Sequence, residues 1–410
     1  MIVTVYAISK NEEKFVSRWA KSMREADYVV VLDTGSVDGT VEALRKEGVT
    51  VKSAEIVPWR FDKARNESLK LVPPETDVCV CTDLDEVFEE GWREKLEKSW
   101  TQNTKQGRYR YVWSHLDSGE AGVEFYIEKM HVLKGFRWVN PVHEILAYSG
   151  RDYSSVTIKD VTLHHYPDDK KSRSSYLPLL ELAVKENPEN DRNMHYLGRE
   201  YMFYRMYDKA IDTLTGHLAL PSATWADERA ASMRYIARCR LALNQTALAE
   251  CWFLRAIAEA PNVREAYVEY SRLLYDRKDW HGVIFFLNKA LKIKNRSVSY
   301  INEPQSWGAL PYDLISLAYY FTYDYDNALR FVDEAIKLSD EKRLKENRRF
   351  FEEAKNGKIY NNVLFFSTLK MIGLFFRGLS ASKRLKKTSK INYDMISAVC
   401  IDFNRQQNFA

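Results

Sequence analysis

The chain lacks two patterns that would assign it to common protein classes. It contains five cysteines, with no CxxC pair and no regular ladder of spacings. A disulfide framework is therefore disfavoured, and a reducing, cytoplasmic location is expected. Neither GxxxxGK[ST] nor GxGxxG occurs, which argues against a kinase or P-loop NTPase.

Long apolar runs are also scarce. The first apolar run is followed by acidic residues, whereas a signal peptide begins with basic residues and ends at a small-residue cleavage site. The most apolar late stretch, 363–376, is interrupted by Lys370 and is shorter than the roughly 20 residues that span a membrane. We therefore expect neither a signal peptide nor a spanning helix.

The chain has no large excess of charge. Its 61 basic and 57 acidic residues give a net charge of +4, but seven basic residues and no acidic ones lie in 370–390. The other residues carry 54 basic and 57 acidic side chains, a net charge of −3. This balance disfavours duplex nucleic acid as a partner.

The first hundred residues alternate between strand-like and helix-like patterns, and the chain's 410 residues suggest two or three domains. We expect strands over 2–8, 28–32, 49–57 and 77–82, with helices over 12–24, 36–46 and 62–71 between them. Short strands rich in Tyr, Trp and Val over 109–165 complete the domain. This order predicts an α/β domain, residues 1–170, whose mostly parallel sheet binds ligands at the carboxyl ends of its strands.

A helical repeat follows. Leu, Ala and aromatic residues recur from starts near 191, 230, 264 and 309, with small residues such as Gly198 where helices would cross closely. The pattern resembles tetratricopeptide repeats and predicts an all-α domain over 171–358. Because concave repeat arrays bind extended peptides, a polypeptide acceptor or partner is expected.

The last segment, 359–410, is apolar and then basic. We interpret it as a helical extension that packs on the last repeat or forms a homodimer. The alternative is a peripheral contact with an anionic membrane surface.

Three polar segments are candidates for chemistry. In DTGS at 33–36, Asp33 ends a strand and can accept a hydrogen bond from a base, Gly35 can turn, and Ser36 can cap a helix. A capped turn without a ligand is the alternative. An aspartic protease would instead need a duplicated all-β structure.

The second and third segments are acidic and basic. Asp83 and Asp85 follow the strand over 78–81, where alternate residues would point the same way and suit Mg²⁺ or Mn²⁺. Arg65, on the helix over 62–71, would lean into the same cleft and hold a phosphate. In both cases the alternative is a solvated surface side chain.

Together, AISKNE at 7–12, DTGSVDGT at 33–40, FDKARN at 61–66 and DLDE at 83–86 resemble family 2, GT-A type glycosyltransferases. The narrower resemblance is to the branch in which a GT-A domain precedes tetratricopeptide repeats, which includes bacteriocin S-glycosyltransferases. It implies a UDP-sugar donor, with Asp33 on the uracil, Asp83 near the ribose and diphosphate, and Asp85 on the metal. The nucleotide side would comprise Asn11, Asp33, Thr34, Gly35, Asp38, Arg65, Asn66 and Asp83.

The resemblance extends to the acceptor side. FRWVNPVHE at 136–144 is similar to the family's His-Glu segment, which makes Glu144 the candidate general base and His143 the residue that orients it. The alternative is a solvated Glu144 with His143 packed under Trp138. In TLHHYP at 162–167, His165 is the expected third metal or diphosphate contact. Pro167 stands where the family has Gly, so His164 is the alternative for this role. A zinc site at the two histidines is disfavoured, because no third and fourth ligand accompanies them at a suitable spacing.

These observations predict a metal-dependent, inverting transferase acting on a peptide, protein or saccharide acceptor. A non-catalytic repeat scaffold is the competing class, and transfer to modified DNA is a further alternative. A glycoside hydrolase is disfavoured because its two carboxylates flank the scissile bond and do not follow a nucleotide-type turn.

Overall fold

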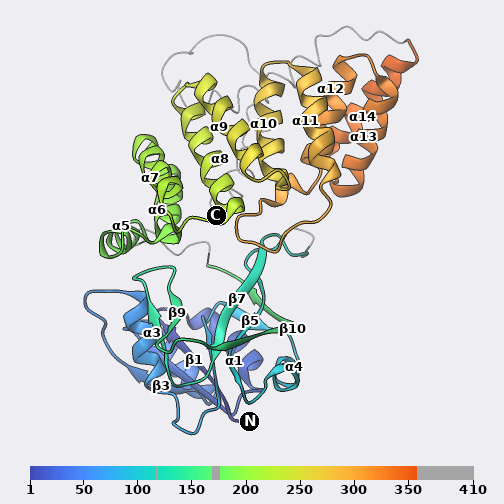
Figure 1. Cartoon of the computed structure of the whole chain (residues 1–410). Coiled ribbons are helices and arrows are strands. Elements are labelled where there is room, and N and C mark those ends of the chain that lie inside the picture. Colours follow the sequence, from blue (N-terminus) through green and yellow to red (C-terminus); the bar gives the residue numbers. More distant parts are fainter. Residues whose placement is uncertain (117–118, 169–175, 358–410) are drawn as a thin grey trace, which may run out of the picture. The chain divides into compact units, whose positions relative to one another are not determined.

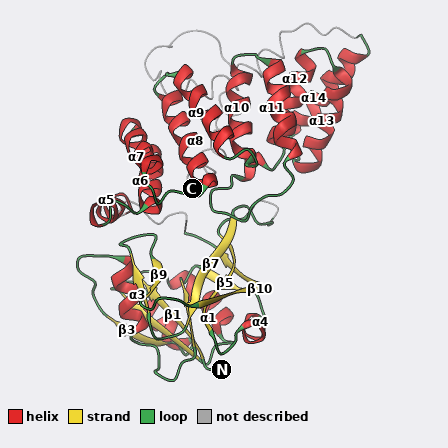
Figure 2. Ribbon diagram, viewed as in Figure 1, coloured by secondary structure: helices red, strands yellow, loops and turns green. Residues whose placement is uncertain are grey.

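The computed structural model describes residues 1–116, 119–168 and 176–357. Strands are confined to the part before residue 166, and every later element is a helix (Figures 1 and 2). The expected fold class, an α/β domain followed by an all-α repeat domain, is confirmed. The predicted boundaries at 170 and 358 fall in or beside the undescribed ranges and stay predictions.

The first domain alternates strands and helices as expected. Its first half contains β1 (Val3–Ser9), α1 (Glu13–Met23), β2 (Tyr28–Asp33), α2 (Thr40–Lys46), β3 (Thr50–Ser53), α3 (Phe61–Leu69), β4 (Val78–Thr82), β5 (Glu86–Phe88) and α4 (Trp92–Ser99). Its second half contains β6 (Thr104–Val112), β7 (Glu124–His131), β8 (Phe136–Val139), β9 (Ile145–Tyr148) and β10 (Ser154–His165).

One sheet organises this domain, in the strand order β3-β2-β1-β4-β7-β6-β10-β5. The first four strands in that order are parallel, whereas β7 pairs antiparallel with both β4 and β6. In the register, Ser9 of β1 lies opposite Asp33 of β2, and Ala7 lies opposite Thr82 of β4. The carboxyl ends of these three strands therefore meet at one edge.

The two faces of the sheet are covered differently. Val3, Val5 and Ala7 of β1 face the core shared with α1, α2 and α4. The alternate residue Tyr6 belongs to the core on the opposite face, with Trp138 of the β8–β9 hairpin, and Ala64 of α3 also packs on that face. This period-two alternation explains why β1 is apolar throughout: both of its faces are buried.

Two local expectations were wrong. The strand expected over 49–57 is only Thr50–Ser53, because the chain leaves the sheet before Pro58. The helix expected from Ser36 begins at Thr40. Ser36 does not cap it, because its hydroxyl donates to the Asp33 carboxylate, while Asp38 accepts from the Thr40 amide.

Paired helices form the second domain. They are α5 (Tyr176–Glu186), α6 (Asp191–Phe203), α7 (Tyr207–Ala219), α8 (Ala226–Ala242), α9 (Thr246–Glu259), α10 (Arg264–Asp276), α11 (Trp280–Lys292), η1 (Pro304–Ser306), α12 (Leu310–Phe321), α13 (Tyr325–Leu338) and α14 (Lys342–Lys355). The first helices of the four pairs begin at 191, 226, 264 and 310, close to the predicted starts.

The helical extension, homodimer contact and membrane-surface contact predicted for 359–410 lie outside the described residues, which end at 357. Among the described helices, none is long and apolar enough to cross a membrane. Cys79, Cys81, Cys239 and Cys251 are free thiols, and the cytoplasmic location stays a prediction.

A glycine allows the first repeat pair to pack closely. A Cβ built on Gly198 of α6 would lie 2.5 Å from Cγ and 2.6 Å from Cδ2 of Leu214 on α7. Leu214 is fully buried, so its side chain has little room to move away. Gly198, which the sequence predicted to lie where two helices cross closely, therefore does lie at such a crossing.

Gly198→Ala is expected to destabilise the helical domain by about 1–3 kcal/mol through overpacking against Leu214. Gly216→Ala on α7 is the matched control, since its Cβ would meet only the Met194 sulfur at 3.3 Å. That control should be neutral or stabilising, by up to about 1 kcal/mol, because alanine favours helix. Urea unfolding followed by circular dichroism measures both. Equal effects of the two substitutions would contradict the close packing.

Candidate functional site

Asp33 organises the turn at the end of β2. Its buried carboxylate accepts from the backbone amides of Gly35 and Ser36, both at 3.1 Å, and from the Ser9 hydroxyl at 3.2 Å. Gly35 has φ of +103°, a conformation that side chains other than glycine strain to adopt. Asp33 therefore shapes this turn. The N–H of a nucleobase, the contact expected from the sequence, would be a further donor to a carboxylate that already accepts several hydrogen bonds.

The other residues of the expected nucleotide side support the same turn. The Asn11 side chain accepts from the Val37 amide at 2.8 Å, and Thr34 donates to the Ser9 carbonyl through both its amide and its hydroxyl. Asp38 is exposed and accepts from Thr40, and hydrogen bonds to this carboxyl outweigh burial in lowering its pKa. The structure brings the loop after β2 together with Asn11, which follows β1.

The sequence predicted that Asp83 and Asp85 would point the same way, like alternate residues of a strand, but the backbone is not extended there. β4 ends at Thr82, and a turn follows in which the Glu86 amide donates to the Asp83 carbonyl at 3.1 Å. The Asp83 amide in turn donates to the Glu86 carboxylate at 2.8 Å. Because the backbone turns here, the Asp83 and Asp85 carboxylates engage different partners.

Arg65 on α3 is the centre of this region. Its side chain is buried, yet it forms ion pairs with Asp83 at 2.9 Å and with Glu144 through Nε. A further nitrogen donates to the Cys81 sulfur at 3.2 Å, and the guanidinium lies 5.2 Å from the centre of the Trp138 ring. Arg65 therefore lies on the buried face of α3, and the alternative that it is a solvated surface side chain is excluded.

A second buried cation, Lys129 of β7, completes the charge network. Its ammonium lies 3.2 Å from Asp83 and 2.9 Å from the fully buried Glu86. Burial alone would raise the pKa of Asp83, but Arg65 and Lys129 hold it well below its usual range. Burial raises the pKa of Glu86 despite the same lysine. Asp83 is thus the firmly ionised member of the pair.

Asp85 and His165 lie together, as the metal prediction requires. Their side chains approach to 3.4 Å, and the His165 ring contacts the Trp113 carbonyl at 3.0 Å through Nδ1. Burial lowers the pKa of His165, but Asp85 and this carbonyl outweigh it and raise the pKa. His164 points elsewhere, toward Glu89 and His115, so His165 fits the metal position better.

Glu144 and His143 lie in the loop between β8 and β9 but face different partners. Glu144 is mostly buried and pairs with Arg65, so the solvated alternative is excluded. His143, at φ of +50°, stacks on Tyr196 of α6 with ring centres 4.0 Å apart. The alternative placed His143 under Trp138, whereas the ring stacks on the first repeat.

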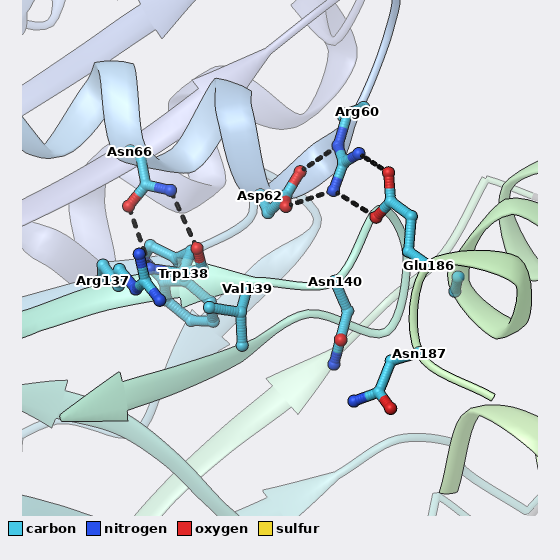
Figure 3. Close-up of a pocket in the computed structure, with 10 residues that line it drawn as sticks. Arg60, Asp62, Asn66, Arg137, Trp138, Val139, Asn140, Glu186 and Asn187 are labelled. Atoms are coloured by element: carbon cyan, nitrogen blue, oxygen red, sulfur yellow. Dashed lines mark hydrogen bonds and ion pairs between the residues drawn. The ribbon is translucent and has the colours of Figure 1, made fainter. Parts of the chain in front are cut away.

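Asn66 is occupied by the backbone of β8. It donates to the Trp138 carbonyl and accepts from the Trp138 amide, both at 2.9 Å, as Figure 3 shows. Asn66 also lines a cavity of about 380 Å³ with Arg60, which pairs with Asp62 and Glu186. This cavity does not include Asp83 or Asp85, so it is distinct from the charged cluster.

Sequence reasoning missed Lys129 and Cys81 as members of the site. Both lie inside strands, where the linear pattern gives no sign of the partner that the sheet places beside them. Lys129 lies between Glu128 and Met130 in a strand of mixed polarity, so the linear pattern carries no signal for its role. A buried strand admits a cation only when acids meet it.

Comparisons with known proteins add little beyond the fold. No protein-family model matches the chain, and no curated protein matches it. Among solved structures, the MamA protein is 18% identical with a TM-score of 0.32 and covers 42% of this chain and 84% of its own. YrrB, a TPR protein with an unusual peptide-binding site, is 17% identical with a TM-score of 0.32, covering 45% and 83%.

One similar structure is an enzyme. Glucosyl-3-phosphoglycerate synthase from Mycobacterium tuberculosis, in complex with Mn²⁺, UDP and glucosyl-3-phosphoglycerate, is 21% identical with a TM-score of 0.24. The similarity covers 27% of this chain and 44% of the enzyme. All three TM-scores are low, so the fold class rests on the elements described above.

Asp83→Asn is expected to lower the free energy of unfolding by about 2 kcal/mol at pH 7. This is less than the roughly 3–5 kcal/mol of a fully buried pair, because the Asp83 side chain is 32% exposed. The depressed folded-state pKa makes this contribution complete above the ordinary pKa of about 4, and it is lost as the pH falls through the depressed value.

Urea unfolding of wild type and variant between pH 3 and 7 checks this prediction. The gap between the two should narrow as the pH falls below about 4. Asp340→Asn, at a fully exposed carboxylate, is the control and should follow the wild type at every pH. A gap that stays constant with pH would contradict the ion-pair account.

Proposed function

We propose that the α/β domain is a metal-dependent glycosyltransferase that uses a UDP-sugar donor. The observation that carries the proposal is the meeting of Arg65, Asp83 and Glu144 at the carboxyl ends of the parallel strands, beside Asp85 and His165. Ligands of parallel α/β sheets bind at that edge. The sequence motifs that resemble GT-A enzymes supply these same residues.

The donor set at Asp85 and His165 fits a divalent cation. One carboxylate and one imidazole, 3.4 Å apart, are compatible with a shared ion, and the imidazole favours Mn²⁺ over Mg²⁺. When bound, the cation would neutralise charge on the leaving diphosphate. In the proposed assignment Asp83 contacts the ribose side. The loop of Asp33, Thr34, Gly35 and Asp38, together with Asn11 after β1, receives the uracil.

Glu144 is the proposed general base. Its Oε1 is held by Arg65, and no contact to Oε2 is recorded from the described residues. Arg65 fixes the carboxylate while the second oxygen takes the acceptor's proton, as an inverting transfer needs. His143 then acts at a distance, through the stack on Tyr196, as a positioning residue for the Glu144 turn.

The acceptor is proposed to be a peptide or protein. The helical pairs begin next to the Glu144 turn, through the contact of His143 with Tyr196. A saccharide acceptor is the alternative within the enzyme class. A non-catalytic scaffold is the alternative outside the enzyme class. The buried ion pairs of Arg65 and Lys129 do not by themselves favour a scaffold.

Calorimetric titration of UDP in the presence of Mn²⁺ tests the donor site. The wild type should bind, and Asp85→Ala should weaken binding at least tenfold. Glu144→Gln should retain UDP binding, since it lies on the acceptor side, but lose at least about a hundredfold in transfer rate once a donor and acceptor are found. Absence of binding to UDP and to a panel of nucleotide-sugars would overturn the transferase proposal.

A further inference from the structure

A buried polar cluster in the helical domain is not explained by the proposed transferase site. His195 of α6, His217 of α7 and Glu228 of α8 each offer a ligand atom, and these atoms lie within 4.8 Å of one another. Both imidazoles are fully buried, and Glu228 is 4% exposed. The three helices pack on one another, so the cluster joins the first repeat pair to the second (Figure 1).

The two histidines leave buried nitrogen atoms without hydrogen bonds. Nε2 of His195 and Nε2 of His217 have no hydrogen-bond partner among the described residues. Such atoms cost roughly 1–3 kcal/mol each when buried, so they call for a partner. The nearest acid is Glu228, whose Oε1 lies 3.4 Å from Nε2 of His217.

We propose that His195, His217 and Glu228 bind a divalent transition-metal ion of the zinc class. Two imidazoles and one carboxylate are a donor set that Zn²⁺ takes with a fourth, exchangeable ligand. In a tetrahedral shell with ligand distances of about 2.0–2.1 Å, ligand atoms lie about 3.4 Å apart. The His217–Glu228 pair is already at 3.4 Å.

The neighbours of the cluster suit metal ligands. Ser232, one turn after Glu228 on α8, lies 2.7 Å from Nδ1 of His195 and 3.0 Å from Nδ1 of His217. A hydroxyl has two lone pairs, so it can accept an N–H from both rings and leave both Nε2 lone pairs for a metal. The Tyr300 hydroxyl donates to Oε2 of Glu228, which leaves Oε1 for the ion.

The described side chains alone do not satisfy both rings. If Ser232 donates to one ring, that ring carries its proton on Nε2, and the other ring keeps an unused Nε2 lone pair. If it accepts from both, two Nε2 lone pairs are unused. Burial lowers the pKa of His195, and three neighbouring arginines add to the effect.

Three arginines, Arg192, Arg199 and Arg234, lie near the cluster, and acids lie close to two of them. Arg234 is the most buried of the nearby arginines, and its charge is matched by Glu269 and Glu303. Arg192 lies near both Glu228 and Glu128. The bound ion would tie α6, α7 and α8 together and stiffen the repeats beside the Glu144 turn.

Titration of the metal-stripped full chain with Co²⁺, a spectroscopic substitute for Zn²⁺, tests the proposal. The expected result is one equivalent with the visible ligand-field bands of a tetrahedral site, displaced by Zn²⁺. Glu228→Gln, which keeps the size of the side chain, and His217→Gln should each weaken binding at least tenfold. His115→Gln, at a partly exposed histidine outside the cluster, and Asp85→Ala should keep the bands.

The Asp85→Ala control separates this site from the proposed donor site, because failure of either leaves the other measurable. Tetrahedral bands that Glu228→Gln forms with the affinity of the wild type, or that are absent in the wild type, would overturn the proposal. If the cluster variants fail to fold, X-ray absorption of Zn²⁺-loaded Asp85→Ala decides. Two imidazole nitrogens and one carboxylate oxygen at about 2.0–2.1 Å are expected, whereas sulfur ligands or an oxygen-only shell would overturn it.

Discussion

The guanidinium of Arg65, buried between Asp83 and Glu144, is the interaction on which the rest of the site depends. A buried charge is costly unless ion pairs and hydrogen bonds satisfy it. Here the partners come from different parts of the chain: Asp83 follows β4, and Glu144 lies in the loop between β8 and β9. The guanidinium of Arg65 therefore holds α3, the end of β4 and the β8–β9 hairpin in one arrangement. If any of the three moved away, a buried charge would be left without its partner.

This constraint also gives the region its chemical division. Two buried cations, Arg65 and Lys129, face three carboxylates, those of Asp83, Glu86 and Glu144. Asp83 is held ionised, whereas burial favours the protonated form of Glu86. Outside this network, Asp85 and His165 form a separate pair that offers ligands to a cation. Asp83 and Glu144, the groups proposed for the nucleotide side and the acceptor side, are thus linked through Arg65, while the pair proposed to hold the metal is not in contact with Arg65.

The sequence predicted the parts of the fold that depend on local pattern. The apolar strands, the helices between them and the repeat starts near 191, 264 and 309 follow from periodicity, and the structure confirms them. Ser36 was misread because its hydroxyl has two local choices, capping a helix or bonding Asp33, and only the folded turn decides between them. Lys129 could not be found at all, since its partners depend on β7 lying beside β4, which no local pattern encodes.

The most direct test of the central claim is a crystal structure with UDP and Mn²⁺, with anomalous data collected at the manganese edge. The account predicts a manganese peak between Asp85 and His165, with the diphosphate beside Asp83 and the Arg65 ion pairs to Asp83 and Glu144 intact. A nucleotide bound elsewhere, or a manganese ion away from Asp85, would contradict it.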